Sequence, residues 1–264
     1  MSLPPAAAAF DAVAERFDAR YGGWKSVAAQ RRAVRAALIE AFAPGARVLE
    51  IGGGTGEDAE WLAGQKREVL LTDVSPAMIR LATSRLRGLG LPVPLVSAAE
   101  HLVASVGGTT GPFDGAFSNF AALNCVTDLA AVGRGLAALV RPGGRVLLVV
   151  FGTCPPGEWL VEVLRGRARL AFRRMSRGDV PARLGGNEFV VRYHRQRDLV
   201  RALAPHFRLL DRRGIGVFVP PSAAEPWISA HPRLLSVLER LDHRLGRVLA
   251  PFGDHVLYEF ERTS

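Results

Sequence analysis

The chain has 264 residues, of which 48% are hydrophobic and 22% charged, so it can form one large domain or two small ones with a sizeable core. Cys125 and Cys154 are its only cysteines, which excludes a disulfide framework and favours a reducing compartment. The start Met1-Ser2-Leu3-Pro4-Pro5 lacks the features of a secretory signal, and no apolar run is long enough to span a bilayer. We therefore expect a cytoplasmic protein without a membrane span.

The net charge of +9 is compatible with a nucleic-acid partner. However, lysine occurs only at Lys25 and Lys66, so the charge is almost all arginine, a bias typical of GC-rich coding sequence. We therefore do not expect nucleic acid to be the partner. Part of the charge is still clustered, in seven arginines: Arg165, Arg167, Arg169, Arg173, Arg174, Arg177 and Arg183. This cluster is either a solvated helix face or an anion-binding surface.

Short apolar runs alternate with helical patterns through the first 150 residues. The runs are nearly continuous in apolar character, as strands buried on both faces of a parallel sheet require. Ser75-Pro76 and Thr127-Asp128 are typical helix starts. This alternation predicts βαβ units and a doubly wound α/β sheet. The predicted strands are 48–51, 69–71, 93–96, 115–117 and 146–151.

The pattern changes after Phe151. Apolar residues at helical spacing predict one or two amphipathic helices over 156–176, and a second helical stretch follows Pro221. Further strands are predicted at 189–193, 207–219 and 255–260, with a short helix at 198–203.

The glycine-dense turn after the first predicted strand is the most informative segment. It reads Gly52-x-Gly54-x-Gly56 and is followed by Glu57 and Asp58, which would place negative charge where a dinucleotide's pyrophosphate should bind. Asp73 ends the second predicted strand, where an acid suits the hydroxyls of a ribose. A ligand with a ribose but no phosphate matches both observations.

Four segments resemble motifs of the class I S-adenosylmethionine-dependent methyltransferases, in the broad group called the methyltransferase type 11 family. The segments are Glu50 to Gly56, Leu71 to Met78, Phe113 to Asn119 and Leu139 to Gly144, and Phe10 to Asp18 is similar to the family's cofactor-covering helix. The resemblance implies a Rossmann-like fold with a mostly parallel seven-stranded sheet, and S-adenosylmethionine as the cofactor, with S-adenosylhomocysteine as its product.

The resemblance also implies a role for each matching residue. Asp73 would hold the ribose, and Ala98 stands where an aspartate often accepts the adenine amino group, so that contact departs from the family pattern. The methionine part would be lined by Glu50, Gly52, Gly53, Gly54 and Gly56. The adenine would meet Val74, Met78, Ala98, Ala99 and Glu100, and the sulfonium would lie beside Asn119 and Phe120.

We expect a single methyltransferase domain over residues 1–264. Its predicted parts are cofactor-covering helices at 1–44, a cofactor-binding core at 45–152, and lid insertions at 153–187 and 221–250. Insertions of this length can close over a small molecule, which favours a metabolite over a macromolecular acceptor.

Candidates for proton removal are few. His194 follows a predicted strand end and Tyr21 follows the covering helix, so both are candidate catalytic residues, whereas His101, His206, His231 and His255 are typical of surface or packing positions. Asn124 either points into the cleft or caps a helix, and Cys125 is interpreted as a structural cysteine. No His or Cys spacing indicates a metal site.

The leading hypothesis is methyl transfer to an O or N nucleophile of a small-molecule metabolite. The alternatives are an RNA-modifying methyltransferase that uses the arginine-rich insertion, and a non-catalytic cofactor-binding subunit. The sequence leaves the acceptor, the methylated atom, the pathway and the oligomeric state open.

Overall fold

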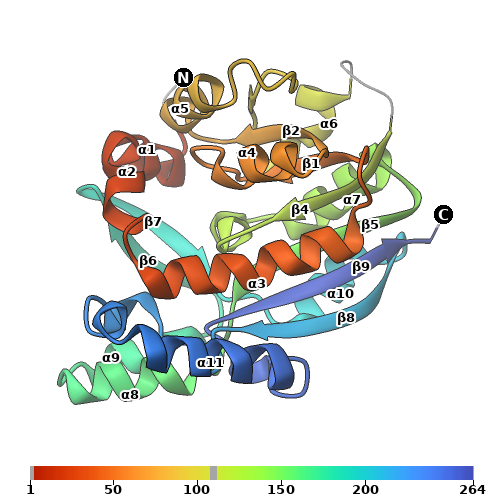
Figure 1. Cartoon of the computed structure of the whole chain (residues 1–264). Helices are drawn as coiled ribbons and strands as arrows, with labels where there is room; N and C mark the ends of the chain where they lie inside the picture. Colours follow the sequence, from red (N-terminus) through yellow and green to blue (C-terminus); the bar gives the residue numbers. More distant parts are fainter. Residues whose placement is uncertain (1–2, 108–111, 264) are drawn as a thin grey trace.

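A twisted seven-stranded sheet forms the centre of the computed structural model, which describes residues 3–107 and 112–263 (Figure 1). Met1 and Ser2 of the predicted leaderless start lie outside the described residues. The sheet strands are β1 (Arg47–Ile51), β2 (Glu68–Asp73), β3 (Leu95–Val96), β4 (Phe113–Ser118), β5 (Val140–Phe151), β8 (Phe207–Ile215) and β9 (His255–Arg262). Their order is β3-β2-β1-β4-β5-β9-β8, and β9 runs antiparallel to both of its neighbours. The predicted doubly wound, mostly parallel α/β sheet is confirmed.

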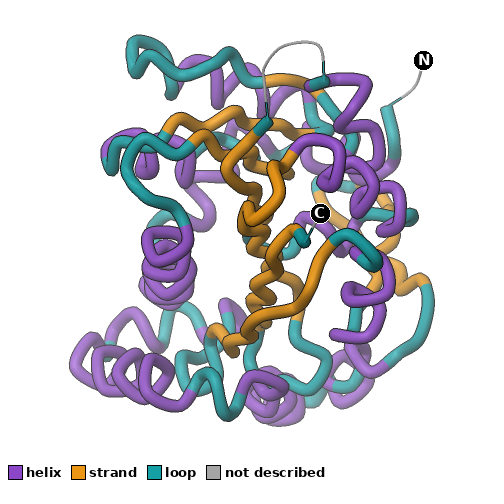
Figure 2. The backbone as a smooth tube through the Cα atoms, turned by 90° about the vertical axis from the view of Figure 1, so that its right-hand side faces the viewer, coloured by secondary structure: helices purple, strands orange, loops and turns teal. Residues whose placement is uncertain are grey.

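Helices cover both faces of this sheet, which is seen edge-on between them in Figure 2. One face packs against α3 (Lys25–Ala41), α4 (Glu57–Gly64) and α5 (Pro76–Arg85), and the other against α6 (Leu102–Val106), α7 (Leu129–Leu139) and α10 (Gln196–Leu203). Val48 and Leu49 are adjacent in β1 and fully buried, in the two different clusters. Successive side chains of a strand point to opposite faces, which explains why the predicted strands are apolar without alternation.

The first segment of the chain forms α1 (Pro5–Asp11) and α2 (Ala14–Tyr21), which pack on α5. The insertion after β5 forms α8 (Pro156–Leu164), α9 (Ala168–Ala171) and the short helix η3 (Arg173–Met175), so the helices predicted over 156–176 are present. It continues into a separate hairpin of β6 (Asp179–Leu184) and β7 (Asn187–Arg192), whose second strand contacts α1.

Several predicted boundaries were wrong for identifiable reasons. The strand β6 was missed because it belongs to a two-stranded hairpin with one exposed face and therefore lacks a long apolar run. The expected strand at 93–96 shortens to Leu95–Val96, and that at 207–219 ends at Ile215 before Gly216, which has φ +69°.

The helical stretch after Pro221 begins later than expected. Two single turns, η4 (Ser222–Ala224) and η5 (Ile228–Ala230), come first, and the long helix α11 spans Pro232–Leu245, followed by η6 (Ala250–Phe252). Pro226 and Pro232 interrupt the backbone hydrogen bonding that a continuous helix would need. Of the helices that the structure describes, none is long and apolar enough to cross a membrane.

Candidate cofactor and acceptor site

The glycine loop joins β1 to α4 at the carboxyl edge of the sheet. The amides of Gly52 and Gly53 donate to the Thr72 carbonyl at 2.8 and 3.1 Å, which ties the loop to β2. Gly54 has φ +55°, and a Cβ added there would meet open space, so its backbone borders room for a ligand. A Cβ at Gly52 would lie 2.3 Å from that of Ala122 in the turn η2 (Ala122–Cys125), so glycine is required for this close approach.

Asp73 lies at the end of β2 directly beside this loop. Its carboxylate accepts hydrogen bonds from the amides of Gly54 at 2.9 Å and Ser75 at 2.8 Å. Burial raises the pKa of Asp73, although these backbone donors act in the opposite direction. The carboxylate therefore shapes the glycine loop in addition to its predicted role of binding a ribose.

Glu50 carries a buried carboxylate with an unpaired oxygen. Its side chain ends among the loop residues with 2% of the residue exposed, and Oε2 has no hydrogen-bond partner in the part of the chain that the structure describes. Burial raises its pKa well above the usual range, and the nearby charge of Asp58 adds to the effect. A cation bound at this oxygen would compensate the buried negative charge, so Glu50 fits the ammonium group of a bound amino acid.

The residues predicted to meet the adenine lie around the start of α5 and the end of β3. Val74 is half-buried, and Met78 is buried against Ala14, Phe10 and Phe17 of the covering helices. The segment of Ala98 and Ala99 follows Ser97, whose amide donates to the Asp73 carbonyl at 2.9 Å. The side chain of Glu100 instead accepts from the Thr127 amide at 3.1 Å. Adenine contacts at these positions stay a prediction.

The helices α1 and α2 are fastened across the glycine loop. Asp18 accepts a hydrogen bond from the Thr55 hydroxyl at 2.7 Å, and Asp11 accepts from the Ala77 amide at 2.9 Å. Tyr21 packs on Phe17, with ring centroids 4.8 Å apart, and its contact with an acceptor stays a prediction. A hollow of about 330 Å³ remains between α1, α2 and α5.

The end of β4, predicted to lie beside the sulfonium, has an unusual backbone. Phe120 and Ala121 have φ of +47° and +61°, a left-handed conformation that is rare for side chains of this size and often marks a functional site. The Asn119 amide group holds this turn, because Nδ2 donates to Asp58 at 2.7 Å and Oδ1 accepts from the Phe120 amide at 2.7 Å. The Arg31 guanidinium lies 4.5 Å from the Phe120 ring centroid.

His255 joins this turn from the far end of the chain. Its ring stacks on Phe151 with centroids 5.0 Å apart and meets the Phe120 ring edge-on at 6.0 Å. Its Nδ1 lies 3.4 Å from Asp254, and among the described residues Nε2 has no hydrogen-bond partner. His255 is thus a buried packing residue, one of the two positions expected from the sequence, and its closeness to Phe120 was not predicted. Because β9 is antiparallel, its first residue reaches the carboxyl edge of β4 and β5, which local sequence does not indicate.

Asp254 is itself held by the insertion. Arg174 contacts it twice, with Nη2 2.9 Å from the carboxylate and Nη1 donating to the backbone carbonyl at 2.6 Å, and Gln30 donates to the carboxylate at 3.1 Å. Burial alone would raise the pKa of Asp254, but Arg174 and His255 hold it well below its usual range. The carboxylate therefore stays ionised beside His255.

The other candidates from the sequence lie near this edge in different roles. His194 is buried, with Nε2 3.1 Å from the Leu123 carbonyl, and burial lowers its pKa, so the ring is neutral at physiological pH; its catalytic role stays a prediction. Asn124 neither caps a helix nor is open to solvent, since it bridges the Arg192 carbonyl and the Phe151 amide. Burial raises the pKa of Cys125 to about 11, which fits an unreactive structural thiol.

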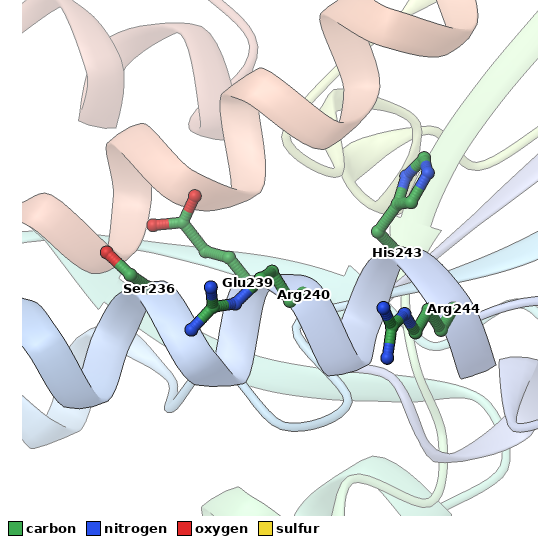
Figure 3. A pocket seen from close by; sticks show the side chains of 5 residues that line it. All are labelled: Ser236, Glu239, Arg240, His243 and Arg244. Atoms are coloured by element: carbon green, nitrogen blue, oxygen red, sulfur yellow. The ribbon is translucent and has the colours of Figure 1, made fainter.

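One surface hollow lies away from this edge. A shallow hollow of about 490 Å³ runs along α11, where Glu239 and His243 point toward α3 (Figure 3). Within the described ranges, no group of three or more His, Cys, Asp or Glu side chains is placed to hold a metal ion.

Sequence comparisons agree with this arrangement. Residues 48–144 match the family described as Methyltransferase domain. The ubiquinone/menaquinone biosynthesis C-methyltransferase UbiE of Bordetella parapertussis is 33% identical over 158 residues, which cover 54% of this chain and 55% of that protein. The UbiE protein of Shewanella frigidimarina is 30% identical over 128 residues, which cover 47% and 50%. The chain thus spans about half the length of these relatives.

Solved structures extend the likeness of fold over most of the chain. A methyltransferase from Mesorhizobium loti matches with a TM-score of 0.54 at 19% identity, over 89% of this chain and 98% of that one. The methyltransferase in a complex with the Trm112 activator of Haloferax volcanii matches with a TM-score of 0.61 at 16% identity, over 98% and 97%.

The sheet order and the solved structures define the fold, which is that of the class I S-adenosylmethionine-dependent methyltransferases. Residues 48–144, which hold the glycine loop and its following acid, match a methyltransferase domain, and the cofactor of such enzymes is S-adenosylmethionine. The residues present fit that cofactor, because Glu50 would hold its ammonium group, Gly54 leaves room beside the loop, and Asp73 would hold its ribose.

The first prediction concerns Glu50. The variant E50Q should bind S-adenosylmethionine about tenfold or more weakly, because a charge-assisted contact is lost. Without cofactor it should be more stable than the wild type at neutral pH. A raised folded-state pKa means that the wild type loses stability as pH rises above the ordinary glutamate value, so the advantage of E50Q should vanish below about pH 4.

Calorimetric titration and urea unfolding at both pH values would measure these effects, with E188Q as the control, because Glu188 is an exposed glutamate of β7. Equal affinity in E50Q and wild type would remove Glu50 from the cofactor site.

The second prediction concerns Asp73. The variant D73A should weaken binding of S-adenosylhomocysteine at least tenfold, because the ribose loses an ionised acceptor. It should also lower the Tm, since the amides of Gly54 and Ser75 lose their partner. A deoxyribose analogue of the ligand separates the two effects. Wild type should prefer the natural ligand over the analogue, whereas D73A should bind both alike; a preference retained by D73A would refute the ribose assignment.

Proposed function

We propose that the chain transfers the methyl group of S-adenosylmethionine to an O or N nucleophile of a small-molecule metabolite, as a single methyltransferase domain whose insertion after β5 closes the acceptor side. The observation that carries this proposal is the enclosure of the carboxyl edge beside Phe120. The rings of Phe120, His255, Phe151 and Tyr193 follow one another there with centroids 5.0–6.0 Å apart, and Arg174 of the insertion covers Phe151 at 4.7 Å. A run of aromatic rings at the carboxyl edge, with the insertion packed on it, suits stacking with a small planar acceptor.

The enclosure also weighs against an RNA acceptor. The arginines of the insertion that lie nearest the site are paired with carboxylates of the same chain: Arg173 and Arg174 with Glu158, and Arg167 with Glu162. Paired arginines have little charge left for a phosphate backbone, which supplies most of the affinity in nucleic-acid binding. Of the arginines between residues 165 and 177, the RNA-modifying alternative would therefore depend on Arg165, Arg169 and Arg177, which are exposed and have no ion-pair partner among the described residues.

Methyl transfer to carbon is a second candidate. The curated relatives are named as C-methyltransferases of ubiquinone and menaquinone biosynthesis, and they match about half of this chain. A carbon nucleophile next to a hydroxyl group also needs a base to remove a proton, so the same enclosure serves either reaction.

His255 is the residue we propose as that base. Asp254 fixes its Nδ1 side, which leaves Nε2 to accept a proton from the acceptor, and its ring contacts Phe120, the residue predicted beside the sulfonium. In-line transfer then requires mainly that the nucleophile be held about 3–3.5 Å from the methyl group in a dry site.

The third prediction tests the reaction. S-adenosylmethionine carrying a tritiated methyl group is incubated with the protein and with separate pools of phenols, quinols, carboxylic acids and amines, and with total RNA. We expect label in an organic extract of one small-molecule pool. Label in RNA would overturn the proposed acceptor class, and cofactor binding without label in any pool would favour the non-catalytic alternative.

The fourth prediction concerns His255. The variant H255Q should lower kcat about 10²–10⁴-fold with the acceptor that the screen identifies, while its affinity for S-adenosylhomocysteine stays unchanged. The acid limb of the pH–rate profile should also disappear, which a purely structural role would not cause. The matched control is H243Q, an exposed histidine of α11 (Figure 3). An unchanged kcat and pH profile in H255Q would exclude His255 as the base.

A further inference from the structure

The helix α8 buries its charged side and exposes its apolar side. Its two carboxylates point inward, with Glu158 and Glu162 only 3% and 5% exposed, whereas Leu160, Val163 and Leu164 are 62%, 48% and 77% exposed. A helix on the surface of a soluble domain normally buries its apolar stripe and exposes its charges. The reversal leaves three large aliphatic side chains, at spacing i, i+3 and i+4, facing out of the molecule.

The inward carboxylates are neutralised within the insertion. Arg173 and Arg174 contact the two oxygens of Glu158 at 2.6 and 2.5 Å, and Arg167 contacts both oxygens of Glu162 at 2.8 and 3.0 Å. The inner side of the insertion is therefore a closed set of ion pairs, and its carboxylates contribute no net negative charge to the outside.

The large side chains on the outer side of the insertion are all apolar or cationic. Leu170, Phe172 and Met175 are 43–49% exposed and continue the apolar surface beyond α8. Arg165, Arg169 and Arg177 are exposed beside them, and among the described residues none of the three has an ion-pair partner. We call the exposed side chains between residues 160 and 177 the insertion face. It lies at one end of the molecule, with α8 and α9 at the lower edge of Figure 1.

We propose that the insertion face binds the surface of a bilayer rich in anionic lipid. Exposed aliphatic and aromatic side chains surrounded by arginines are the pattern of interfacial segments, in which apolar groups enter the acyl boundary and guanidinium groups pair with phosphates. A second copy of the chain is disfavoured as the occupant, since it would bring two sets of unpaired arginines together. Nucleic acid would satisfy the arginines but leave the leucines exposed to water.

The test is co-sedimentation of the full chain with vesicles. One set is pure phosphatidylcholine, and the other is an equal mixture of phosphatidylcholine and phosphatidylglycerol. We expect the wild type to bind the anionic vesicles much more tightly than the neutral ones, with binding that weakens as salt rises. The double variant L160S/L164S should bind about a hundredfold more weakly, because two large apolar side chains no longer enter the bilayer.

Charge and apolar contributions are separated by a second pair of variants. R165Q/R169Q/R177Q should lose about a hundredfold on anionic vesicles and little on neutral ones. The matched controls are L89S and R80Q/R87Q/R201Q, exposed positions outside the insertion, which should bind like the wild type. Thermal unfolding of all variants should be unchanged, since these side chains are on the surface.

Three outcomes would overturn the proposal. They are absence of wild-type binding to anionic vesicles, equal binding by L160S/L164S, and a dimer in gel filtration that L160S/L164S abolishes, which would make the insertion face a contact between copies.

Discussion

The ion pairs of Arg174 determine how the insertion sits on the sheet. This guanidinium is 6% exposed and lies between Glu158 of α8 and Asp254 at the start of β9. It therefore joins α8 to Asp254, which is 80 residues from Arg174 along the chain. Removing one partner of such a buried pair leaves an uncompensated charge, which typically costs about 3–5 kcal/mol. The arrangement therefore specifies one position of the insertion even where it adds little net stability.

Two consequences follow from this position. On the inside, Asp254 remains ionised next to His255, and the aromatic rings beside Phe120 are covered. On the outside, α8 must turn its other side to solvent, since the carboxylate side is committed to Arg173 and Arg174. The leucines of α8 are exposed because the ion pairs that hold the insertion against Phe151 occupy the opposite side of the helix. The proposed chemistry and the proposed membrane contact share one structural cause.

Much of the cofactor side could be predicted from sequence, because its features are local. The strand, the glycine turn and Asp73 lie within 27 residues, and glycine positions with positive φ leave a direct mark on composition. The acceptor side could not, because it is assembled from segments far apart. Whether His255 is a surface or a site residue depends on the antiparallel pairing of β9 with β5. Likewise, whether Arg174 is a free surface cation depends on Glu158 and Asp254, which no sequence spacing connects to it.

The cofactor side of the site holds a buried negative charge that the protein does not compensate. Glu50 is buried and one of its carboxylate oxygens has no hydrogen-bond partner among the described residues. Asp58 forms ion pairs with Arg31 and Arg35 at 2.9 and 2.8 Å. Burial raises the pKa of Glu50, and the charge of Asp58 raises it further. The unfavourable charge is thus concentrated on one carboxylate. A cofactor that carries an ammonium and a sulfonium group is cationic at the place where the protein is short of positive charge. Cofactor binding would therefore compensate the buried charge of Glu50. The free energy gained in this way can stabilise the packing of α1 and α2 over the glycine loop.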